Sequence, residues 1–182
     1  MKGFERKNQL FSLCGLNCGL CPMHLNRYCP GCGGGNGNQS CKIAKCSLDH
    51  GGVEYCFQCE EYPCEKYEHI DDFDSFVTHR NQIADMEKAK MVGIAVYNAE
   101  QSEKVEILNY ILDHFNDGRK KTFFCVAVNL LDLSVIKQIL NQISEMEGFE
   151  DWMEKEQSAL VVKMFRAAAD EKKIELKLRK KK

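Results

Sequence analysis

Apolar side chains recur at helical spacing over much of residues 69–182. Positions three and four apart are apolar within 73–84, 105–115, 136–143 and 153–168, as on the buried face of an amphipathic helix. An aspartate is placed to cap two of these segments, Asp71 or Asp72 before the first and Asp132 before the third. The pattern therefore predicts a compact array of helices in this part of the chain.

Two apolar runs, 91–97 and 122–128, have no clear period. Composition allows each as a buried strand, and together they would form a small β-α-β unit. A single buried helix through residues 123–131 fits the spacing equally well.

Residues 1–68 have a different pattern. Cys-Pro pairs at 21–22 and 29–30 and a glycine-rich run at 31–37 are typical of turns. So few large apolar side chains cannot bury enough surface for independent folding, so this segment needs cross-links. We expect a mainly α protein, in which a small irregular cysteine-rich module (1–68) precedes a helical domain (69–182).

Charge and hydropathy limit the function classes. The chain of 182 residues has 25 basic and 27 acidic side chains, a net charge of −2, and residues 1–70 are balanced at seven of each. A nucleic-acid-binding module is usually clearly basic, so we do not expect such a partner. The basic tail, 171–182, is typical of a solvated helix end. The sequence contains no run of eighteen consecutive apolar residues, which a membrane-spanning helix would need. The N-terminus lacks a signal-peptide pattern. We expect a cytoplasmic protein whose cysteines stay reduced.

Ten of the eleven cysteines lie in the first 64 residues. Three pairs have C-x-x-C spacing, which lets one tight turn direct both sulfur atoms at one ion, and two such pairs complete a closed shell of four thiolates. The spacing predicts structural zinc sites, two ions in all, and favours metal over a disulfide framework. The candidate ligands are Cys14, Cys18, Cys21, Cys29, Cys32, Cys41, Cys46, Cys56, Cys59 and Cys64.

The pairing of these ligands has two solutions. Sequential pairing closes loops of seven (22–28) and nine (47–55) residues, whereas interleaved pairing leaves nineteen and twenty-three. The interleaved loops lie nearer the usual separation of about fifteen to twenty residues in zinc ribbons, so we favour them. Interleaving joins Cys18/Cys21 with Cys41/Cys46, and Cys29/Cys32 with Cys56/Cys59. Cys14 and Cys64 are then spare, or replace a member of a pair, and His24 and His50 have plausible ligand spacing.

Other chemistries fit less well. Thiolates also hold iron–sulfur clusters, but the ferredoxin run C-x2-C-x2-C-x3-C-P is absent from the sequence. Cys14-x3-Cys18-x2-Cys21 has radical-SAM spacing, yet 182 residues with one possible β-α-β unit cannot build that barrel. The glycine-rich run lacks the Gly-Lys-Ser/Thr ending of a phosphate loop. No local pattern identifies a catalytic residue, and Cys125 lies in an apolar run typical of a core.

The cysteine-rich segment resembles the microbial family DUF3795, a domain of unknown function. The resemblance covers roughly residues 10–68, and it is carried by the order and spacing of the cysteines and by Tyr62-Pro63-Cys64. Residues 116–131 also look like a helical extension of some members. The resemblance implies a zinc-binding module, a helix over 122–131 and a cytoplasmic bacterial or archaeal protein, but no activity.

We therefore expect a zinc protein that acts by binding an unknown protein or small molecule. The alternatives are an iron–sulfur or thiol-redox protein, and an enzyme with a pocket between the two domains.

Overall fold

The computed structural model describes residues 3–35 and 41–181, and the regular structure in these ranges is helical, without a strand. One isolated antiparallel bridge joins Phe11 to Asn17. The mainly α class is therefore confirmed. The end of the glycine-rich run, residues 36–37, lies outside the described residues.

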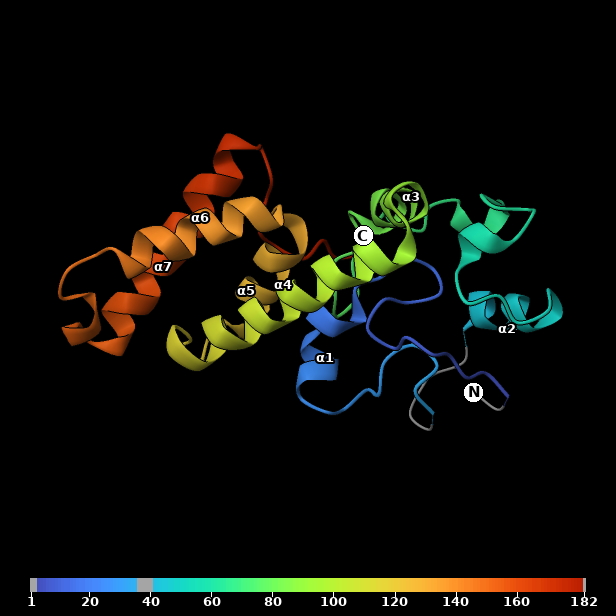
Figure 1. The fold of residues 1–182 in the computed structure, drawn as a ribbon, viewed down its shortest axis with the longest axis horizontal. Helices are drawn as coiled ribbons and strands as arrows, with labels where there is room; N and C mark the ends of the chain where they lie inside the picture. The colour runs from blue at the N-terminus through green and yellow to red at the C-terminus, as the bar shows by residue number, and fades with distance from the viewer. Residues whose placement is uncertain (1–2, 36–40, 182) are drawn as a thin grey trace. The chain divides into compact units, whose positions relative to one another are not determined.

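The chain divides into two compact units, Met1–Ser102 with Leu178–Lys182, and Glu103–Lys177. The first unit contains η1 (Cys18–Leu20), α1 (Pro22–Leu25), α2 (Lys42–Asp49), η2 (Cys56–Gln58), η3 (Glu65–Tyr67), α3 (Gln82–Val92) and the start of α4 (Ile94–His114). The second contains the rest of α4, then α5 (Lys121–Leu130), α6 (Leu133–Ser144), η4 (Phe149–Asp151) and α7 (Glu154–Glu171). The first unit thus extends past the boundary expected after residue 68. Figure 1 labels the helices α1 to α7 along the chain.

The cysteine-rich segment shares a core with α3 and the start of α4. Phe11 and Tyr55 pack in one buried cluster with Met86 and Ala89 of α3 and with Tyr97 of α4. The rings of Phe11 and Tyr97 lie 4.5 Å apart between centroids. Residues 69–102 therefore supply apolar surface that residues 1–68 lack on their own.

The helix expected over 73–84 is wrong. Residues 71–80 form turns and bends, and α3 begins only at Gln82, behind Asn81. The carboxylate of Asp74 accepts from the backbone N–H of His79 (2.7 Å) and from the hydroxyl of Thr78 (3.3 Å). In these contacts a side-chain carboxylate accepts the hydrogen bonds that main-chain carbonyls would accept in a helix. Because α3 begins only at Gln82, neither Asp71 nor Asp72 caps a helix here.

The basic tail is also bound rather than a solvated helix end. α7 ends at Glu171, and Arg179 then pairs with Asp74 through its backbone N–H (2.7 Å) and its guanidinium (3.2 Å). The backbone N–H of Asp74 donates to the carbonyl of Arg179 in return (2.9 Å). This exchange attaches Leu178–Lys182 to the first unit.

The second unit follows the predicted helical pattern. The ambiguous run 122–128 lies within α5, where Phe124 is fully buried and its ring meets Phe165 of α7 edge-on at 5.9 Å. The other run, 91–97, is split between α3 and α4 by Gly93, at φ 89°. Both strand readings are therefore wrong. α6 begins after Asp132 as predicted, but the Asp132 side chain makes no cap bond and accepts from Lys172 instead (2.8 Å).

None of the helices in the described part of the chain has the length and apolar character needed to cross a membrane.

Candidate metal centre

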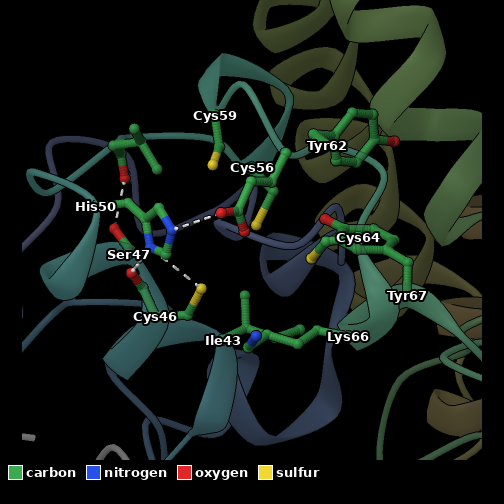
Figure 2. Close-up of a pocket in the computed structure, with 12 residues that line it drawn as sticks. Ile43, Cys46, Ser47, His50, Cys56, Cys59, Tyr62, Cys64, Lys66 and Tyr67 are labelled. Atoms are coloured by element: carbon green, nitrogen blue, oxygen red, sulfur yellow. Dashed lines mark hydrogen bonds and ion pairs between the residues drawn. The ribbon is translucent and has the colours of Figure 1, made fainter.

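Four of the cysteines line one small pocket. Cys46 comes from α2, Cys56 from η2, and Cys59 and Cys64 from the loops that follow η2. Figure 2 shows their sulfur atoms around the pocket, with Ile43 and Tyr67 at its wall. The pocket has a volume of about 20 Å³, which is room for one water-sized sphere. A site of this size accepts a single ion but no organic molecule.

Short-range hydrogen bonds bring these cysteines together. The hydroxyl of Ser47 donates to the carbonyl of Val53 (2.9 Å), and the N–H of Gly52 donates to the carbonyl of Ser47 (2.7 Å). These bonds close the loop after α2 and return the chain toward Cys56. The N–H of Cys59 then donates to the carbonyl of Cys56 (3.0 Å), in the tight turn that C-x-x-C spacing predicts.

The pairing of the ligands stays a prediction, but this grouping differs from the interleaved one, which joins Cys46 with Cys18 and Cys21. Cys46 lines the same pocket as Cys56 and Cys59, as sequential pairing requires. The nine-residue loop is short, but it closes because α2 takes up its first residues and the Ser47 contacts fold the remainder. Cys64, a spare ligand in the sequence reasoning, lines the same pocket. We call Cys46, Cys56, Cys59 and Cys64 the pocket thiols.

Burial shapes the electrostatics of the pocket. Burial is the main reason that the pKa of the Cys56 thiol is raised to about 12. A hydrogen bond from Tyr67 lowers this pKa, whereas the neighbouring thiols of Cys14, Cys64 and Cys46 raise it. Cys46 in turn raises the pKa of the Lys66 ammonium. Lys66 thus places a positive charge where deprotonated pocket thiols would be negative.

His50 lies at the edge of the same pocket. Its Nδ1 is 2.9 Å from the carbonyl oxygen of Cys46 and 3.6 Å from the Cys46 sulfur, and its Nε2 is 3.5 Å from a carboxylate oxygen of Glu61. The Cys46 carbonyl and Glu61 both raise the pKa of the imidazole. His50 therefore contacts both Glu61 and a pocket thiol, while its ring nitrogens are engaged by oxygen atoms.

The other six cysteines of the segment do not line this pocket, and we call them the N-terminal thiols. Burial raises the pKa of Cys18 well above its ordinary value, and the next causes are the thiols of Cys32, Cys14, Cys21 and Cys29. Burial also raises the pKa of Cys14 to about 11, with Cys32 and Cys41 adding to the effect. The group is Cys14, Cys18, Cys21, Cys29, Cys32 and Cys41.

Backbone contacts position the N-terminal thiols. The N–H of Cys21 donates to the carbonyl of Cys18 (3.1 Å), and the N–H of Cys32 donates to that of Gln9 (3.2 Å). Gly31 has φ 91°, and a Cβ there would lie 2.6 Å from the Gln9 carbonyl oxygen. Glycine is therefore required beside Cys32 for sterics and for backbone conformation. His24 is bound to the Cys29 carbonyl through Nδ1 (3.1 Å).

The two thiol groups are adjacent in the first unit. The N–H of Cys56 donates to the carbonyl of Leu13 (2.9 Å), and the hydroxyl of Tyr67 donates to the carbonyl of Cys14 (3.2 Å). Gln82 of α3 donates to the same Cys14 carbonyl (3.0 Å). Tyr67 therefore contacts both groups, because its single hydroxyl proton can be donated to the Cys14 carbonyl or to the Cys56 sulfur.

All eleven cysteines carry free thiols, and Cys125 is buried in α5 as a core residue. Among the described residues, no three Cys, His, Asp or Glu side chains have donor atoms close enough together to share one metal ion. The structure thus gathers the predicted ligands into two groups without converging their sulfur atoms. Spacing alone could not reveal that Tyr67, Lys66 and Glu61 join the pocket.

Comparison with known proteins agrees with the resemblance. A family model described as "Protein of unknown function (DUF3795)" matches residues 10–69, the part of the chain that carries both thiol groups. Neither the curated proteins nor the solved structures contain a match to the chain.

Proposed function

We propose that this chain binds structural zinc ions through its cysteine thiolates, one at the pocket thiols and one within the N-terminal thiols. The ions would stabilise the first unit in a protein that acts by binding another molecule. The observation that carries the proposal is the pocket of about 20 Å³ lined by four cysteines from α2, η2 and the following loops.

The donor set fits zinc in kind and number. Four thiolates are a common closed tetrahedral shell for this ion. The sulfur atoms do not converge, but each cysteine side chain has a single rotatable bond to its sulfur, so convergence requires rotamer changes and small backbone shifts. The Lys66 ammonium offsets part of the negative charge of four thiolates.

The ion would supply a cross-link and no reaction. A shell closed by four thiolates leaves no coordination position for water, so metal-assisted hydrolysis is not expected. The contribution of this chain is to position the cysteine ligands through contacts of neighbouring residues. The Ser47–Val53 contact closes the loop before Cys56, and Tyr67 ties the pocket to the Cys14 backbone. A closed shell of this kind favours a binding role over a catalytic one.

Metal analysis of the full chain, purified without oxygen, tests the proposal. We expect two zinc ions per chain, one ion in Cys59→Ser and in Cys18→Ser, and two in the matched control Cys125→Ala. Iron with acid-labile sulfide and visible absorption would instead establish the iron–sulfur alternative. Cobalt substitution provides a second readout, since thiolate-to-cobalt absorption should fall stepwise in the same variants. Metal-free wild type, or equal loss in the control, would contradict the proposal.

A further inference from the structure

The second unit contains a much larger cavity, distant in sequence from the two thiol groups. It lies where α4 ends at His114, where α6 ends at Ser144, and beside η4. Its volume is about 270 Å³, close to the lower end of the range for small-molecule pockets, about 300–1,000 Å³. A cavity of this size accommodates a small organic molecule, such as one aromatic ring with a short side chain.

The floor of the cavity is apolar and aromatic. Phe115 and Phe149 are 6% exposed and Ile143 is 4% exposed. The Phe115 and Phe149 rings lie 5.9 Å apart, and the half-exposed Tyr110 meets Phe115 edge-on at 5.8 Å. An apolar body gains from burial on this floor, and the faces of such rings attract cations.

The polar groups around the cavity offer acceptors. The side-chain donors of Ser144 and Gln157 are already engaged by the carbonyls of Asn141 and Phe149, each at 2.8 Å. Nδ1 of His114 lies 2.9 Å from the carbonyl of Tyr110, so this nitrogen is engaged and does not face a ligand. A ligand that carries hydrogen-bond donors therefore complements the lining.

The charges favour a cation. The lining residues that the structure describes include the carboxylate of Glu150 and no lysine or arginine. The C-terminal ends of α4 and α6 both reach the cavity, and each helix C-terminus has a partial negative charge of about half an elementary charge. A carboxylate and two helix ends therefore act in the same direction.

We propose that this cavity binds a small organic cation, an amine with an aromatic or branched aliphatic body. The apolar part lies against Phe115, Phe149 and Ile143, and the ammonium group lies toward Glu150. None of the residues that line this cavity belongs to the two thiol groups, so the proposal does not depend on whether the chain carries zinc.

The single tryptophan of the chain provides the assay. Trp152 lies beside the cavity, with its ring 5.5 Å from that of Phe149, so its fluorescence should report occupancy in the full chain. Three probes of matched size separate charge from shape, namely phenethylamine, 2-phenylethanol and phenylacetate. We expect saturable binding of phenethylamine, with a dissociation constant at least tenfold below that of phenylacetate and below that of 2-phenylethanol.

Two variants test the role of the carboxylate. Glu150→Gln should weaken phenethylamine binding about threefold, the usual effect of one partly exposed ion pair, and leave 2-phenylethanol binding unchanged. Glu145→Gln removes the same charge from an exposed residue outside the lining and should leave both unchanged. Equal affinity for the three probes, no saturation by phenethylamine, or equal effects of the two variants would overturn the proposal.

Discussion

Replacing Asp74 by asparagine tests what attaches the C-terminal segment to the first unit. The Asp74 carboxylate is fully buried, and it accepts from the N–H groups of His79 and Arg179, from the hydroxyl of Thr78 and from the Arg179 guanidinium. An asparagine keeps one acceptor oxygen but turns an N–H₂ group toward donors, so at least one backbone N–H loses its partner.

The expected cost of Asp74→Asn follows from this geometry. Breaking a buried ion pair by removing one partner costs about 3–5 kcal/mol, but the Arg179 side chain is 35% exposed and recovers some hydration. We therefore expect a loss of about 2–4 kcal/mol in the free energy of unfolding of the first unit. The matched control is Asp72→Asn, an exposed carboxylate beside His69, which should cost less than about 1 kcal/mol.

The effect should depend on pH in one direction. Burial alone would raise the pKa of Asp74, but hydrogen bonds from the Arg179 N–H, the His79 N–H and the guanidinium outweigh it, so the folded-state pKa is lowered. The carboxylate therefore stabilises the fold above its unfolded pKa of about 4 and loses this contribution as pH falls through the folded value.

Urea unfolding followed by circular dichroism measures the loss, and amide exchange at residues 74–79 and 178–181 assigns it to this site. The gap between wild type and Asp74→Asn should be full at pH 7 and narrow below about pH 4. Equal stability of the two asparagine variants at pH 7, or a gap that widens on acidification, would refute the reasoning.

Two further predictions concern the first unit. In urea unfolding, Gly15→Ala should destabilise the first unit by more than the control Gly51→Ala. Both glycines have positive φ, but only a Cβ at Gly15 would meet the Gln82 carbonyl oxygen, at 2.5 Å. Equal losses of stability would mean that this contact relaxes freely. If the chain carries zinc, chelation should remove amide-exchange protection from residues 10–69 and from α3, since structural zinc contributes roughly 10–16 kcal/mol, while α6 and α7 keep theirs. Unchanged protection in α3 would show that its core does not depend on the metal.

The helices that could be predicted from sequence are those whose stability comes from a regular apolar face. α6 buries Ile136, Ile139 and Ile143, α7 buries Val161 and Phe165, and the two helices pack against each other. The false prediction over 73–84 has the same spacing, but Asp74 there binds Arg179, which lies 105 residues away. Periodicity is local, so it cannot register a competing contact made by a distant residue.

The candidate site shows the same division between local and distant information. Spacing identified cysteine pairs because the turn of a C-x-x-C pair needs only local contacts, such as Cys59 to Cys56. It could not group the pairs, because the return of the chain to Cys56 depends on Ser47 and Val53. Tyr67, which contacts both groups, carries no spacing signal at all.

Residues 1–68 do not depend on cross-links alone, because they share a core with residues of α3 and α4. Phe11 and Tyr55 are buried, but against Met86, Ala89 and Tyr97, which lie beyond residue 68. The cohesion of this unit therefore has two sources, a core shared with α3 and α4 and the proposed thiolate cross-links. Because Tyr55 immediately precedes the proposed ligand Cys56, and Cys56 itself packs against the same core, the two sources are coupled. Damage to either should weaken the other, so α3 belongs with the candidate metal centre rather than with the helical unit that follows.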